Sequence, residues 1–115
     1  MKKQVFALVA LTVAASSSFA AAVECSVSEV LAGSLFSQTV VVQENSTEFV
    51  TTTSQKTKGF VSYTSGLVVI NLYDVNEQQA KYVVTPLAND GQVAMTFAPA
   101  YDTTRATTVL CKPQQ

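Results

Sequence analysis

The chain has 115 residues, of which 48% are hydrophobic and 13% charged, with seven basic and eight acidic side chains. This length suits one domain, and so balanced a charge argues against nucleic acid as a partner. The chain has no histidine, which excludes Ser-His and Cys-His nucleophile systems and imidazole metal ligands.

The N-terminal segment has the pattern of a secretory signal peptide. Two lysines near the start precede an apolar run from Val5 to Ala15, and small residues follow. That order is typical of a cleaved leader. We predict a signal peptide over residues 1–20, cut after Ala20 or Ala22, and an exported protein that is periplasmic or extracellular. The apolar run is shorter than the 20 or so residues that span a bilayer, so we expect no stable membrane insertion after cleavage.

The exported part is predicted to be one β domain over residues 21–112, followed by a short polar tail at 113–115. Losing the two leader lysines leaves five basic residues against eight acidic ones, a net charge of −3. The five basic residues are scattered, whereas nucleic-acid-binding surfaces need clustered Lys and Arg. A protein is therefore the expected kind of partner.

Two cysteines lie near the two ends of the exported part, Cys25 and Cys111. Cysteines in exported domains usually pair, and two of them allow one connectivity. We expect a disulfide that joins the terminal regions. In the chain-entropy model, closing so long a loop stabilises a domain by about 4 to 5 kcal/mol.

The exported part is predicted to be β-strand throughout. Its apolar residues are mostly β-branched and threonine is abundant, which favours strands. Turn signals such as Ser65-Gly66 recur at a spacing of about ten residues, as in sandwiches and barrels. The expected strands cover 24–31, 35–43, 48–54, 58–64, 67–73, 78–86, 92–98 and 104–111.

Three alternating stretches support these strands: Val68-Ile70-Leu72, Ala80-Tyr82-Val84 and Val93-Met95-Phe97. The polar stretch 48–57 is typical of an edge strand or a solvent-facing hairpin. Residues 26–35 stay ambiguous, because Ser26 and Glu29 have the spacing of a helix capping box while the residues beyond them are strand-like.

Short connections between these strands predict an all-β fold, a small antiparallel meander of about seven or eight strands. The disulfide brings the first and last strands together. An up-and-down sheet whose ends meet is a closed or nearly closed barrel. A two-sheet sandwich with its termini on adjacent strands satisfies the same observations, and both architectures stay open.

No residue pattern indicates catalysis, a cofactor or a metal. The closest acidic pair, Asp74 and Glu77, lies in a predicted turn, where such residues are usually solvated turn-formers. The glycines are not clustered into a phosphate-binding loop. We therefore expect a protein that is not an enzyme, with no cofactor and no metal site.

What remains is a binding function. We expect an exported non-catalytic domain that binds another macromolecule, such as an enzyme inhibitor or an accessory factor. Tyr63, Tyr73 and Tyr101 are the candidate contact residues, because exposed aromatic side chains give large contact areas at low entropic cost. The alternatives are a structural or adhesive surface subunit that pairs through an edge strand, and a carrier of a small apolar ligand inside a barrel.

Overall fold

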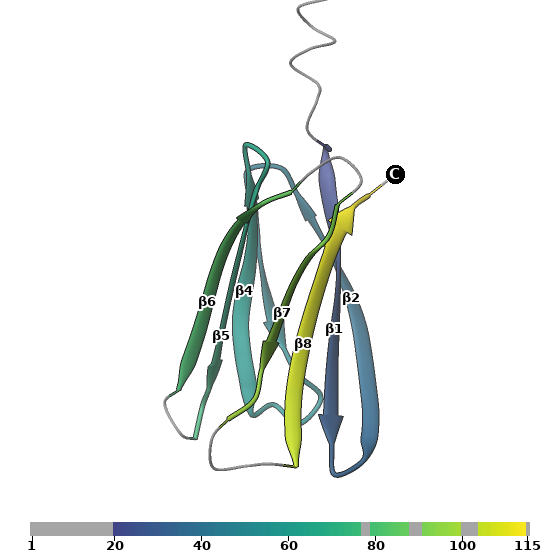
Figure 1. The fold of residues 1–115 in the computed structure, drawn as a ribbon, viewed down its shortest axis with the longest axis vertical. Coiled ribbons are helices and arrows are strands. Elements are labelled where there is room, and N and C mark those ends of the chain that lie inside the picture. Colours follow the sequence, from purple (N-terminus) through teal and green to yellow (C-terminus); the bar gives the residue numbers. More distant parts are fainter. Residues whose placement is uncertain (1–19, 77–78, 88–90, 100–103, 115) are drawn as a thin grey trace, which may run out of the picture.

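A computed structural model describes residues 20–76, 79–87, 91–99 and 104–114. The described chain forms two antiparallel sheets of four strands packed face to face (Figure 1). The first sheet has the order β2-β1-β8-β7 and consists of β1 (Ala22–Leu31), β2 (Ser34–Gln43), β7 (Val93–Phe97) and β8 (Arg105–Pro113). The second sheet has the order β3-β4-β5-β6 and consists of β3 (Ser46–Thr51), β4 (Thr57–Thr64), β5 (Leu67–Asp74) and β6 (Ala80–Pro86).

The predicted all-β class and the antiparallel meander are confirmed. Each strand follows its neighbour in sequence around the molecule, and β8 returns to pair with β1. The ambiguous segment 26–35 is a strand and part of a hairpin, not a helix. The last strand continues through the buried Pro113.

The sheets do not close into a barrel, and the sandwich alternative describes the fold. The ladder is interrupted between β2 and β3 and between β6 and β7. A side chain crosses each gap: Gln38 Nε2 donates to Thr51 O at 2.7 Å, and Lys81 Nζ donates to Thr96 O at 2.8 Å. Both side chains occupy core-facing positions of edge strands. Full closure of the ladder would bury them, which is costly for polar groups.

The core lies between the sheets and consists of the alternate, inward side chains of both. Val68, Ile70 and Leu72 on β5 are fully buried, and the predicted Val93-Met95-Phe97 face of β7 is buried as well. The Ala80-Tyr82-Val84 face lies on the outside instead. The pairing of Leu72 with Lys81 sets this register, because paired residues share a face of the sheet.

Two-residue turns fix the register of two hairpins. Ala32-Gly33 joins β1 to β2 and Ser65-Gly66 joins β4 to β5, and all four residues have positive φ. This is the backbone of the turn whose twist matches that of antiparallel strands, and glycine adopts it at little cost.

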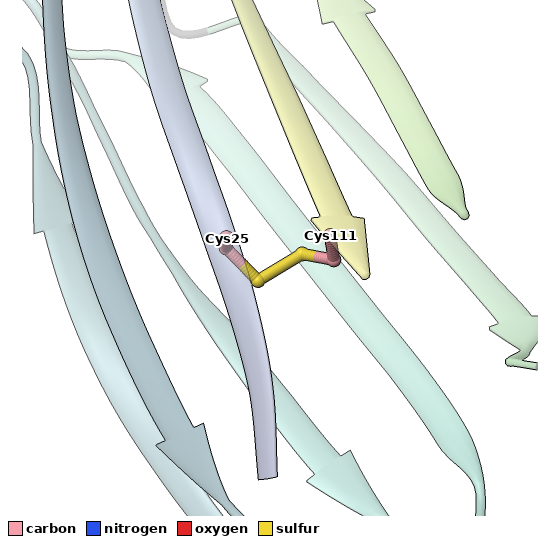
Figure 2. The surroundings of a disulfide bond; sticks show 2 residues. All are labelled: Cys25 and Cys111. Carbon is pink, nitrogen blue, oxygen red and sulfur yellow. A yellow bond between two sulfur atoms is a disulfide. The ribbon is translucent and has the colours of Figure 1, made fainter. Parts of the chain in front are cut away.

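The predicted disulfide is present and joins β1 to β8. Cys25 and Cys111 face each other across the two central strands of the first sheet, 86 residues apart in sequence and fully buried (Figure 2). Cys25 lies near the start of β1 and Cys111 near the end of β8, so the bond lies at the end of the sandwich where the described chain begins and ends.

Candidate functional site

Tyr63, one of the three predicted contact residues, lies in the core. Its side chain is 1% exposed and its hydroxyl donates a hydrogen bond to Ala20 O at 2.7 Å. Burial raises the pKa of the Tyr63 hydroxyl above its ordinary value, and the nearby Glu44 carboxylate raises it further. Tyr63 is therefore a packing residue and does not belong to a contact surface.

Tyr73 lies on the opposite side of the same sheet. The two-residue turn pairs Tyr63 with Val68, so the inward side chains are odd-numbered on β4 and even-numbered on β5, and Tyr73 points outward. Tyr73 pairs with Lys58 and is 42% exposed. The third predicted residue, Tyr101, lies outside the described residues.

Four aromatic side chains, Phe49, Phe60, Tyr73 and Tyr82, lie on the outer surface of the second sheet, and we call them the aromatic face. Phe49 pairs with Phe60, and Tyr82 lies in the same row beyond Asn71. Phe49 is 82% exposed and Tyr82 is 61% exposed. Phe60 between them is half-buried. Such exposed aromatic surface marks interaction sites more often than chance would place it.

The surroundings of the aromatic face carry a single charged side chain in the three central rows and form a shallow hollow. Lys58 is the charged residue of the three central rows, whose other members include Thr47, Thr51, Ser62, Val69 and Val84. A hollow of about 150 Å³ lies over β3 and β4, lined by Phe49, Phe60, Tyr73, Lys58 and their neighbours. A surface of aromatic rings with hydroxyl groups and one cation resembles the centre of a protein interface, where charged residues are depleted.

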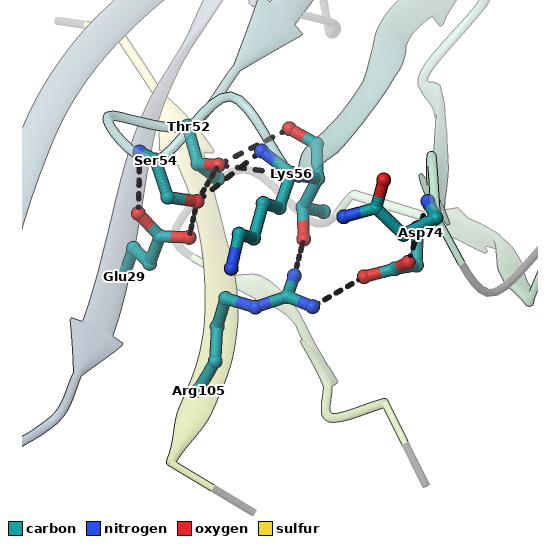
Figure 3. A network of polar contacts seen from close by, with 8 residues as sticks. Glu29, Thr52, Ser54, Lys56, Asp74 and Arg105 are labelled. Carbon is teal, nitrogen blue, oxygen red and sulfur yellow. Dashed lines mark hydrogen bonds and ion pairs between the residues drawn. The ribbon is translucent and has the colours of Figure 1, made fainter. Parts of the chain in front are cut away.

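A network of buried polar side chains lies between the two sheets, at the end of the sandwich away from the disulfide. Arg105 on β8 reaches across to the other sheet, where its Nη1 donates to Thr57 Oγ1 at 2.8 Å and its Nη2 to Asp74 Oδ2 at 2.5 Å (Figure 3). The other Asp74 carboxylate oxygen accepts from Asn76 N at 2.9 Å. The network therefore ties β8 of one sheet to β4 and β5 of the other.

Glu29 makes a matching connection from β1 (Figure 3). Its carboxylate accepts from Ser54 N at 3.0 Å and from Ser54 Oγ at 2.6 Å, in the turn between β3 and β4. The turn is closed by bonds between Thr52 and Thr57. We call Glu29, Ser54, Thr57, Asp74 and Arg105 the sheet clamp, because each contact in it joins the two sheets or braces a residue that does.

The sheet clamp corrects the expected place of Asp74. The sequence pattern indicates a solvated turn residue, but Asp74 is fully buried and forms an ion pair. Glu77, its predicted neighbour, lies outside the described residues. Both carboxylates of the clamp are already occupied by protein donors, which suits a structural role.

The clamp could have been found from alternation. In each of four strands an inward polar residue lies near the same end of the sandwich, next to inward apolar residues: Glu29 after Val27, Arg105 and Thr107 before Val109, Thr57 before Val61 and Asp74 after Leu72. The aromatic face was missed because its residues alternate like a core face, and periodicity does not say which side of a sheet is covered.

Within the described residues, no three His, Cys, Asp or Glu side chains gather in a way that could hold a metal ion. The same part of the chain contains no helix long and apolar enough to cross a membrane. Comparison with protein-family models, curated proteins and solved structures finds no match to this chain.

Proposed function

We propose that the chain is an exported, non-catalytic domain that binds another protein through its aromatic face. The observation that carries the proposal is the exposure of Phe49 and Tyr82 in one row on the outer surface of a sheet. Burying a large aromatic side chain against a partner contributes strongly to binding. While these side chains are exposed to water, the free energy of burying them remains available for binding a partner.

The carrier function has less support. The side chains between the sheets form one buried cluster, and the hollow beside Phe49 opens on the outside of the second sheet. The catalytic alternative also has less support, because the buried carboxylates of Glu29 and Asp74 are bonded to protein groups. The rigid sandwich instead supports recognition by a preformed surface.

The proposal is tested by comparing two serine variants. Wild-type protein immobilised as bait in the exported fraction should capture a partner, which is then purified for titration. Phe49→Ser with Tyr82→Ser should weaken that binding by about tenfold or more, because interface aromatics commonly account for over 1 kcal/mol each. Val75→Ser is the matched control, since Val75 is 40% exposed but lies outside the aromatic face, in the connection after β5.

Both variants must keep the unfolding midpoint of the wild type, which their exposure predicts. Equal binding by wild type and the double variant would contradict the proposal. So would an equal loss in the Val75→Ser variant, because that loss would reflect general surface hydrophobicity and not a defined face.

A further inference from the structure

β2 is an edge strand: it makes a side-chain hydrogen bond toward β3, from Gln38 Nε2 to Thr51 O at 2.7 Å, but forms no backbone ladder with that strand. It pairs with β1 alone in its sheet, and every residue from Ser34 to Thr39 is exposed. Figure 1 shows β2 at the right-hand margin of the first sheet, beside β1. At ten residues it is twice as long as β7, the strand at the other margin of the same sheet.

The edge of β2 carries none of the usual protection against pairing. Its sequence, SLFSQTVVVQ, has no charged residue, no proline and no glycine. Natural edge strands are commonly blunted by charges, proline or shortness. The other edges follow this rule: β6 carries Lys81 and Pro86, and β3 and β7 are short.

The order of residue types along β2 is nearly the same when it is read from either end. From Leu35 to Val41 the order is two apolar residues, a hydroxyl, Gln38, a hydroxyl and two apolar residues. We propose that β2 pairs antiparallel with β2 of a second copy, about a two-fold axis through Gln38. This register places Leu35 opposite Val41 and Phe36 opposite Val40 of the other copy. It also places Ser37 opposite Thr39, and Gln38 opposite itself.

The register agrees with the sides that these residues occupy. Paired residues share a face, and each proposed pair joins two residues of the same parity on β2, so outward side chains meet outward ones. Leu35 is 66% exposed and would lose water contact to Val41 of the other copy. A charged partner segment would find no opposite charge on β2, whereas two neutral copies meet without repulsion.

The resulting dimer is closed. Joining the two β2 strands makes one continuous sheet, and the two-fold axis uses both open edges, so growth stops at two copies. The proposal does not depend on the proposed function, because the aromatic face lies on the other sheet and stays exposed in this arrangement.

The test measures self-association by sedimentation over a wide concentration range. Gln38→Lys and Gln38→Glu each place like charges opposite one another on the axis, and each should weaken dimerisation by about two- to fivefold. Mixing the two variants should restore a dimer, because opposite charges then face each other. Gln43→Lys is the matched control, since the two charges would lie roughly 30 Å apart along the strands.

A second measurement uses wild-type protein alone. Amide hydrogen exchange in residues 35–41 should slow as concentration rises, while exchange in β6 should not change. Two outcomes would overturn the proposal: a wild type that stays monomeric up to hundreds of micromolar, or a dimer that neither charge at position 38 weakens and whose β2 amides exchange independently of concentration.

Discussion

Arg105 and Asp74 are charged side chains that the sandwich removes almost completely from water. Their side-chain exposures are 2% and 0%. Burying a pair of charges costs roughly what their attraction returns, but a single buried charge without its partner is strongly unfavourable. The pair therefore favours the observed docking of the two sheets, since any packing that separates Arg105 from Asp74 breaks a buried ion pair.

Replacing Asp74 by asparagine tests this role. Asp74→Asn keeps the size of the side chain but removes the negative charge that faces the Arg105 guanidinium, and we expect it to lower the free energy of unfolding by about 3 to 5 kcal/mol. Glu24→Gln is the control: Glu24 lies 3.8 Å from Lys112, and both side chains are substantially exposed. Removing such a surface pair should cost less than about 1 kcal/mol.

Urea denaturation of both variants and the wild type gives the comparison. Asp74→Asn combined with Arg105→Met should recover part of the loss, because it removes the buried positive charge as well. Equal midpoints for Asp74→Asn and Glu24→Gln would show that the ion pair does not fix the docking of the sheets.

For single residues, the sequence was least informative where the neighbouring residues fit two different structural environments. Asp74 follows an apolar strand and precedes a turn, and the turn pattern fits a solvated carboxylate equally well. Glu29 has capping-box spacing from Ser26, so a local helix signal competed with the alternation that places it in the core. The deciding contacts come from Arg105 to Asp74 and from Ser54 to Glu29, and both partners are distant in sequence.

Among the elements, β1 begins before the later of the two predicted cleavage points. Ala22 is its first residue and is buried. Ala21 O accepts a hydrogen bond from Glu44 N at 2.9 Å, and Ala22 O accepts one from Gln114 N at 3.0 Å. These bonds attach the start of β1 to the end of β2 and to the end of the chain.

A chain that begins at Ala21 should therefore be more stable than one that begins at Val23. The shorter chain loses two backbone hydrogen bonds and a buried methyl group, and we expect its free energy of unfolding to be lower by about 1 to 2 kcal/mol. Denaturation of the two recombinant forms measures the difference. Identical unfolding curves would show that the contacts of Ala21 and Ala22 contribute nothing to the fold.

Strand positions were predictable from sequence because local signals agree there. Turn residues such as Ser65-Gly66 coincide with breaks in apolar alternation, and the structure places all eight strands close to their predicted ranges. Registers were not predictable to the same degree. The face of the sheet on which Tyr63 or Tyr82 lies depends on the exact number of residues in the preceding turn. One residue more or less shifts the pairing by one position, which moves every side chain of the strand to the other face.

For the whole molecule, the sequence indicated that the ends meet but not how the sheet closes. The cysteine pair predicts adjacent first and last strands, and β1 and β8 are adjacent. Barrel and sandwich differ at two gaps in the ladder. The sandwich follows from Gln38 and Lys81 at inward positions of edge strands, a feature that becomes visible once the register is known.

The disulfide links two strands that lie at opposite ends of the sequence of the domain. β1 and β8 are the central strands of their sheet, and their pairing closes a loop of 86 residues. Without the bond, folding must bear the entropic cost of closing that loop before the first sheet can form. With it, the two strands are neighbours even in the unfolded chain, and the longest-range contact of the fold becomes a local one.

Removing the bond should therefore change both equilibrium and kinetics. We expect the Cys25→Ala, Cys111→Ala variant to lose about 4 kcal/mol of unfolding free energy, most of it through a less restricted unfolded state. Its denaturant m-value should rise, because the unfolded chain exposes more surface when it is not cross-linked. Folding should slow more than unfolding accelerates if β1 and β8 pair in the transition state.

Stopped-flow denaturation of wild type under oxidising and reducing conditions, with the variant alongside, separates these effects. Reduced wild type should match the variant, apart from the packing lost with two sulfur atoms. An unchanged m-value with a large loss of stability would assign the effect of the bond to packing in the folded core, and not to closure of the chain.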